Sequence, residues 1–146
     1  MQLFKLDPRL AADTYQMGEL PGASVLLIRN AHYPWLVLVP HTDETEFHRL
    51  SAQAQTLLMT QASHLASFIE LHYSVDKINI ASIGNMVSQM HLHVVGRHKD
   101  DPTWPDVVWG AQAFKAYTAE ELRELHLRLL QALGDDFKAS ELILND

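Results

Sequence analysis

The sequence contains no cysteine, which excludes disulfides, thiolate nucleophiles and cysteine-ligated zinc. It also contains no run of about 18 apolar residues, the length that a membrane-crossing helix needs. Its first residues lack the long apolar core of a secretory signal. From these absences we expect a cytoplasmic protein that makes no membrane contact.

Cationic residues are few. The chain has 11 lysines and arginines against 18 aspartates and glutamates, so its formal net charge is -7. Broad binding of nucleic acid needs a basic surface, and we therefore expect no nucleic-acid polymer as a partner. A small phosphorylated ligand is not excluded, because a local basic or amide-rich pocket can exist in an acidic molecule.

The rest of the composition is that of an ordinary globular protein, with 146 residues, 47% of them hydrophobic and 20% charged. This length fits a single domain, residues 1–146, that can bury a core. Apolar segments with the alternating or continuous pattern of strands occur at 24–28, 35–39, 77–83 and 89–94. A turn at Pro21-Gly22 predicts a hairpin, and 107–110 is a candidate for a short edge strand.

Two segments have helical periodicity. The longer helix is predicted over 52–72 with Ser51 as its cap. The second follows a capping box formed by Thr118 and Glu121, and Gly134 is its expected stop. We therefore predict an α+β fold. It has a mostly antiparallel sheet of about five strands, one long helix across the sheet and a second helix near the carboxyl end.

One stretch departs from this ordinary pattern. Apolar and polar residues alternate from Gln89 to Val94, which is typical of a strand with one buried face. We expect Met90, Leu92 and Val94 to point into the core. The side chains of Gln89, His91 and His93 then form a row on the other face, spaced by roughly 7 Å.

Three interpretations of this row remain open from the residues alone. Histidine is tolerated on the wet face of an antiparallel sheet, so the row can be a solvated surface. Alternate histidines can also bind a metal, but Gln89 is a poor further donor and the nearest carboxylates follow a glycine. Finally, a neutral imidazole can attack phosphorus while a second imidazole donates a proton or binds phosphate oxygens.

The residues around the row resemble a known family. The segment from Gln89 through His91 and His93 to Val94-Val95-Gly96-Arg97 resembles the signature of the histidine triad (HIT) superfamily of nucleotide hydrolases and transferases. That signature is His-x-His-x-His, two apolar residues and often an arginine. Upstream, Leu27-Ile28-Arg29-Asn30 and the strand from Trp35 to Pro40 resemble two family strands and their connection. The resemblance covers about residues 25–99.

This resemblance implies a mechanism. His91 matches the nucleophile that attacks the α-phosphorus of a dinucleoside polyphosphate or a nucleoside phosphoramidate, giving a nucleotidyl-histidine. His93 matches the residue that binds the phosphate and assists the leaving group. The positions assigned to nucleotide binding are Asn30, Asn79, Asn85 and Arg97. No metal or cofactor is implied. Family members commonly form homodimers that extend the sheet, and the apolar run 35–39 is compatible with that.

Gln89 departs from the signature, because it stands where the first histidine is expected. Glutamine can donate and accept hydrogen bonds but cannot transfer a proton. The rate of hydrolysis and the preference for water over another acceptor therefore stay open. A nucleotide-binding module with lost or slowed catalysis is the alternative function. On that alternative, restoring histidine at position 89 is expected to raise the rate.

Aromatic and histidine residues outside the row receive simpler interpretations. Trp35, Trp104 and Trp109 are expected to be core or interface residues. Trp104 and Trp109 lie in the loop after the motif, so either is also a candidate to close over a base. His48 is expected to face water.

Overall fold

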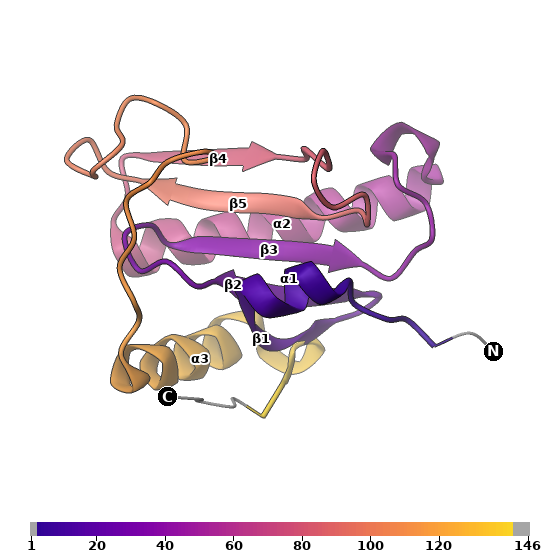
Figure 1. Cartoon of the computed structure of the whole chain (residues 1–146). Helices are drawn as coiled ribbons and strands as arrows, with labels where there is room; N and C mark the ends of the chain where they lie inside the picture. The colour runs from indigo at the N-terminus through magenta and orange to yellow at the C-terminus, as the bar shows by residue number, and fades with distance from the viewer. Residues whose placement is uncertain (1–2, 142–146) are drawn as a thin grey trace.

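The computed structural model describes residues 3–141 and confirms the α+β prediction (Figure 1). Within these residues six strands form one sheet in the order β4-β5-β3-β2-β1-β6, and every paired strand is antiparallel to its neighbour. The strands are β1 (Thr14–Leu20), β2 (Ala23–Ile28), β3 (Trp35–Pro40), β4 (Lys77–Ala81), β5 (Leu92–Arg97) and β6 (Lys138–Ala139). The helices are α1 (Pro8–Asp13), α2 (Ala52–Tyr73) and α3 (Ala119–Leu133), with 3-10 turns η1 (Phe47–Arg49) and η2 (Gly134–Asp136).

The long helix α2 forms where the apolar periodicity predicts it. The Ser51 side chain accepts a hydrogen bond from the backbone N–H of Ala54, which caps its first turn. Its predicted stripe of Leu58, Ala62, Leu65 and Ile69 is buried against the sheet. Figure 1 shows α2 running across one face of the sheet, and α3 adds to the same core through Leu122, Leu125 and Leu129.

The capping box before α3 is also confirmed. The Thr118 hydroxyl accepts from the Glu121 N–H, and the Glu121 carboxylate accepts from the Thr118 N–H. The hairpin at Pro21-Gly22 joins β1 to β2, and Gly22 has a φ of 70°, which glycine adopts without strain.

The opposite face of the sheet carries a second cluster of buried apolar side chains. Leu10 of α1 packs there with Trp35, Val37 and Val95 of the sheet and with Val108 of the loop after β5. Figure 1 shows α1 on this face. The histidine row lies on this side, because His93 and Val95 alternate along β5 with residues that face α2.

Several details differ from the prediction. The sixth strand, β6, pairs with β1 over only two residues, too few to produce a periodic pattern. Residues 107–110 form no strand, because Val108 is buried against the sheet face instead of pairing along its edge. The apolar run of β3 lies between β5 and β2, so that run offers no free edge for pairing between copies.

The strand that carries the histidines is shifted relative to the predicted 89–94. It begins at Leu92 and continues to Arg97, so Gln89 and His91 lie just before it. β4 ends at Ala81, two residues before the predicted end. Within residues 3–141 no helix is both long and apolar enough to cross a membrane.

Candidate active site

The two histidines of the row are buried side by side. The alternation is confirmed, because Met90, Leu92 and Val94 lie in the core against α2. His91 and His93 are each only 7% exposed, and their ring centroids lie 4.9 Å apart. The interpretation as a solvated polar surface is therefore wrong for both histidines.

The hydrogen bond of His91 leaves one ring nitrogen available. Its Nδ1 lies 2.7 Å from the backbone oxygen of Gln89. A carbonyl oxygen only accepts hydrogen bonds, so Nδ1 must carry the hydrogen. In the neutral ring the lone pair then resides on Nε2, and that nitrogen is the one that can act as a nucleophile.

His93 has the opposite arrangement at Nδ1. The indole Nε1 of Trp35 lies 2.9 Å from His93 Nδ1, and an indole N–H only donates. His93 Nδ1 therefore accepts, and the hydrogen of the neutral ring sits on Nε2. Burial, and secondarily the neighbouring His91, lower the pKa of His93 to about 4. At neutral pH His93 is thus a neutral ring that offers an N–H to an acceptor.

Tryptophan rings enclose His93. Trp35 and Trp109 lie with their centroids 5.6 and 5.4 Å from the His93 ring and 5.9 Å from each other. The indole nitrogen of Trp109 is buried and has no hydrogen-bond partner within residues 3–141. The sequence offered no direct signal for the Trp35–His93 bond. The two residues become neighbours only through the register of β3 and β5, in which Val37 faces His93 and Trp35 faces Val95.

Both polar atoms of the Gln89 side-chain amide form hydrogen bonds with the amino-terminal segment of the chain. Its Oε1 accepts from the backbone N–H of Asp7 at 2.8 Å, and its Nε2 donates to the backbone oxygen of Lys5 at 2.9 Å. The segment therefore holds the side chain at the first position of the row, two residues before His91.

A cavity of about 310 Å³ opens at this end of the sheet. Its walls include Gln89 and His91 together with His48 of η1 and Gly84 in the β4–β5 connection. Its volume lies at the lower end of the range typical of small-molecule sites, which is roughly 300–1,000 Å³. His48 is exposed, as predicted, but it also lines this cavity, and its sequence position gave no sign of that.

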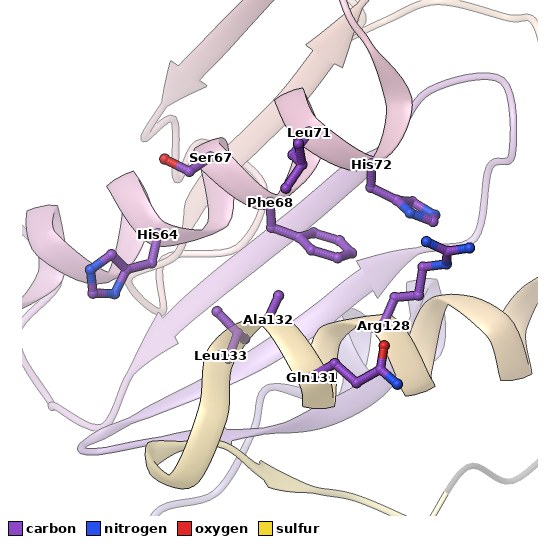
Figure 2. A pocket seen from close by; sticks show the side chains of 9 residues that line it. All are labelled: His64, Ser67, Phe68, Leu71, His72, Arg128, Gln131, Ala132 and Leu133. Atoms are coloured by element: carbon purple, nitrogen blue, oxygen red, sulfur yellow. The ribbon is translucent and has the colours of Figure 1, made fainter.

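A larger cavity, of about 600 Å³, lies elsewhere, between α2 and α3 (Figure 2). Phe68 and Leu71 of α2 and Leu133 of α3 supply its apolar surface, and Arg128 lies at one end of it. None of the row residues lines it. Size alone therefore does not identify the site, and the smaller cavity beside His91 has the reactive groups.

Arg97 and Asn79 lie together, but in a buried network. Arg97 is 1% exposed and makes two hydrogen bonds to the Asp101 carboxylate, Nε to Oδ2 at 2.7 Å and Nη2 to Oδ1 at 3.0 Å. Its Nη1 donates to the Asn79 side-chain oxygen at 3.2 Å. Arg97 follows His93 by four strand residues, which places it roughly 13 Å further along β5. The network therefore holds the far end of the strand and the loop that follows it.

The charge of Asp101 is stabilised within this network. Burial acts to raise the pKa of its carboxyl group, but hydrogen bonds from Arg97 and from the backbone N–H groups of Thr103 and Trp104 outweigh that effect. The resulting pKa lies below its ordinary value, so Asp101 is ionised and paired at neutral pH.

The two remaining asparagines differ in their contacts. The Asn30 amide donates to the backbone oxygen of Ala113, and its oxygen accepts from the N–H groups of His32 and Lys115. It thereby joins the β2–β3 connection to the segment before α3. Asn85 is exposed next to Gly84 of the cavity wall. Within residues 3–141 no group of three or more histidine, aspartate or glutamate side chains is arranged to hold a metal ion.

Comparison with known proteins identifies the family. A family model described as the HIT domain matches residues 9–100, more than half of the 146-residue chain. The chain belongs to the histidine triad (HIT) family. HIT proteins form a superfamily of nucleotide-binding hydrolases and transferases, and the chain falls in that class. No match was found among curated proteins.

Solved structures of HIT proteins resemble the chain over most of its length. A histidine triad protein from Bradyrhizobium japonicum is 36% identical, with a TM-score of 0.87 over 91% of this chain and 100% of that one. One from Marinobacter aquaeolei VT8 is 38% identical, with a TM-score of 0.85 over 90% and 97%. One from Sinorhizobium meliloti 1021 is 34% identical, with a TM-score of 0.84 over 88% and 96%.

Proposed function

We propose that this HIT protein is a nucleotide phosphohydrolase or nucleotidyltransferase that acts through His91. His91 Nε2 attacks the α-phosphorus of a dinucleoside polyphosphate or a nucleoside phosphoramidate. A P–N bond forms, and the bond from phosphorus to the leaving phosphate or amine breaks. Water or another acceptor then attacks the same phosphorus, releases the nucleotide and returns the electron pair to His91.

The observation that supports this proposal most is the pairing of opposite hydrogen-bond states in two adjacent rings. Bonds at Nδ1 leave the lone pair of His91 on Nε2 and the hydrogen of His93 on Nε2. A phosphate between the rings is offered a nucleophile by one and a hydrogen-bond donor by the other. Because both rings are buried, the donor acts in a site of low polarity, where it stabilises negative charge more strongly than in water.

The proposed nucleotide-binding residues divide by their contacts. Asn85 stands beside the cavity, and no hydrogen bond within residues 3–141 engages its side chain, which favours a phosphate contact. Asn30 is proposed to border the ribose while its amide holds the segment before α3. Arg97 and Asn79 are proposed to support the site from a distance, because their polar atoms bond to each other and to Asp101.

The test is hydrolysis of diadenosine polyphosphates and of an adenosine phosphoramidate. His91→Ala is expected to lower the rate by on the order of a thousandfold or more, because it removes the nucleophile. The matched control is His64→Ala, an exposed histidine on α2 that lines only the remote cavity, and it should retain full activity. Acid quenching during turnover should trap an AMP adduct on the peptide that contains His91. Activity that survives His91→Ala contradicts the proposal.

The alternative is a nucleotide-binding module, and Gln89 favours it, since glutamine transfers no proton. Calorimetry that detects AMP binding, combined with no turnover and no trapped adduct, identifies this alternative.

We further propose that the protein is a homodimer. β4 forms an edge of the sheet and its Ile80 side chain is 43% exposed, so this edge is free to pair. Light scattering on the purified protein measures the oligomeric state.

A further inference from the structure

Gln89 joins two parts of the molecule that are far apart in sequence. Its side-chain amide bonds to the Lys5 oxygen and the Asp7 N–H, which are 84 and 82 residues away. The two backbone groups belong to residues only two positions apart, and one primary amide satisfies both. A carboxamide is suited to this task because it has a donor and an acceptor side by side in one plane.

The segment that Gln89 binds is also packed in place. The Phe4 ring stacks on the His41 ring, with centroids 4.2 Å apart and an interplanar angle of 27°. Phe4 and Leu6 pack against the apolar cluster that contains Trp35 and Val95. The segment therefore lies on the same face of the sheet as His93, and its position does not depend on Gln89 alone.

The main chain of Gln89 contacts the proposed nucleophile. Its backbone oxygen accepts the hydrogen bond from His91 Nδ1 at 2.7 Å, and this bond places the ring hydrogen on Nδ1 and the lone pair on Nε2. The same residue is thus fixed by the amino-terminal segment through its side chain and orients His91 through its carbonyl group.

We propose that Gln89 is a positioning residue for His91, and that the segment from Lys5 to Asp7 completes the site by holding Gln89 in place. In this role the residue at the first triad position transfers no proton. It sets the orientation and the hydrogen position of the His91 ring. The inference deepens the proposed function, since it matters for catalysis only if His91 is the nucleophile.

The proposal reverses the expectation for a histidine at position 89. The donor and acceptor nitrogens of an imidazole point away from each other, so the ring cannot bond to the Lys5 oxygen and the Asp7 N–H together. Gln89→His is therefore expected to lose at least one of the two bonds to the segment and to lower the rate, although it restores the full His-x-His-x-His signature.

The first experiment needs no activity. In the full chain at pH 7, the ¹⁵N shifts of the His91 ring should report a hydrogen on Nδ1. Gln89→Ala should give a mixture of the two hydrogen positions, and it should speed hydrogen exchange of the Asp7 amide by about tenfold, the equivalent of one lost hydrogen bond. Gln89→Glu keeps the acceptor for Asp7 but loses the donor to Lys5, so its values should fall in between.

A second set of variants leaves position 89 intact. The pair Phe4→Ala and Leu6→Ala loosens the packing of the segment and should move the His91 ring shifts in the same direction as Gln89→Ala. Lys5→Ala is the matched control, because Gln89 bonds to the Lys5 backbone oxygen and the exposed side chain is dispensable. Wild-type ring shifts and Asp7 exchange in Gln89→Ala overturn the proposal, as do wild-type ring shifts in the Phe4 and Leu6 pair.

Kinetics on adenosine phosphoramidate separate this inference from the proposed function. Gln89→Ala should lower kcat by about tenfold with KM changed less than about twofold, because orientation of the nucleophile is lost and binding is not. A Gln89→His variant faster than wild type overturns the positioning role. If wild type and variants alike turn over no nucleotide, the proposed function fails. The ring shifts and the exchange rates then decide the positioning role by themselves.

Discussion

At the carboxyl end of β5, Arg97 is buried with its carboxylate partner Asp101 and with the Asn79 oxygen, and every group has a bonded neighbour. Near the amino end of the same strand, His91 and His93 are also buried, but within residues 3–141 each ring bonds through Nδ1 only. Both ends carry polar groups in an apolar setting. One end uses them fully to hold the fold, whereas the other has two ring nitrogens that bond to no partner within residues 3–141 and that we propose contact the nucleotide.

This contrast explains how one strand serves two purposes. A buried ion pair with complete hydrogen bonding is rigid, and removing one partner leaves an uncompensated charge. The imidazole of His93 avoids that cost because it is neutral, since burial lowers its pKa to about 4. The chain can therefore bury His93 beside His91 although no carboxylate within residues 3–141 pairs with His93.

The largest effect on stability is expected at the carboxyl end. Asp101→Ala leaves the Arg97 guanidinium buried and unpaired and should lower the free energy of unfolding by about 3–5 kcal/mol. Urea denaturation measures it. The control is Glu124→Ala, which breaks an exposed pair with Arg128 and should cost less than about 1 kcal/mol. Equal losses of unfolding free energy in the two variants would show that burial does not make the Arg97–Asp101 pair more important for stability than an exposed pair.

The next effect concerns pH at the amino end. The pKa of His93 is about 4 in the folded protein and about 6.5 when unfolded, so between these values the unfolded state binds a proton that the native state does not. The free energy of unfolding should therefore fall as pH drops from 6.5 to 4, by up to about 3 kcal/mol from this group. His93→Asn keeps an acceptor for Trp35 but does not titrate. Urea denaturation at several pH values gives the free energy of unfolding of the wild type and of His93→Asn. The difference between the two proteins should change only below about pH 6.5, and a difference that stays constant with pH refutes the assignment.

The smallest effect separates the two tryptophans that contact His93. Trp35→Phe removes the N–H that bonds to His93 Nδ1 and should cost about 1–2 kcal/mol of stability and about tenfold in kcat/KM. Trp109→Phe removes an N–H that has no partner in residues 3–141, so its stability should change by less than about 1 kcal/mol. Denaturation and phosphoramidate hydrolysis compare the pair. If Trp109→Phe lowered stability and kcat/KM as much as Trp35→Phe does, the Trp35–His93 hydrogen bond would not be the cause of the losses.

Much of the fold could be predicted, because its signals are local. The spacing of Leu58, Ala62, Leu65 and Ile69 by four, three and four residues predicts the buried face of α2. The alternation around His91 predicts which side chains pack against α2 and which lie on the opposite face of the sheet. β6 could not be predicted, since two residues have no period and their pairing with β1 depends on where α3 ends.

The site was less accessible to sequence reasoning, because its bonds join distant segments. The resemblance to HIT proteins pointed to His91 and His93, but not to the Trp35 indole that sets the hydrogen position of His93 across 58 residues. It also assigned Arg97 to nucleotide binding, and that assignment stays a prediction. The ion pair of Arg97 with Asp101 had no signal in the sequence, because Arg97 ends a strand and the four-residue spacing brings side chains together only on a helix. Nothing in the sequence marks the Lys5 carbonyl as a partner of Gln89, because backbone groups carry no residue identity.

The hydrogen bonds of Gln89 also imply an order in which parts of the chain fold during synthesis. The segment from Lys5 to Asp7 is made first, yet its partner emerges more than 80 residues later. Contacts of such sequence separation form late, because the intervening chain must first be ordered. His91 is therefore expected to acquire its fixed orientation only after β5 has joined the sheet. A nascent chain then carries the histidines without the arrangement that we propose makes His91 a nucleophile.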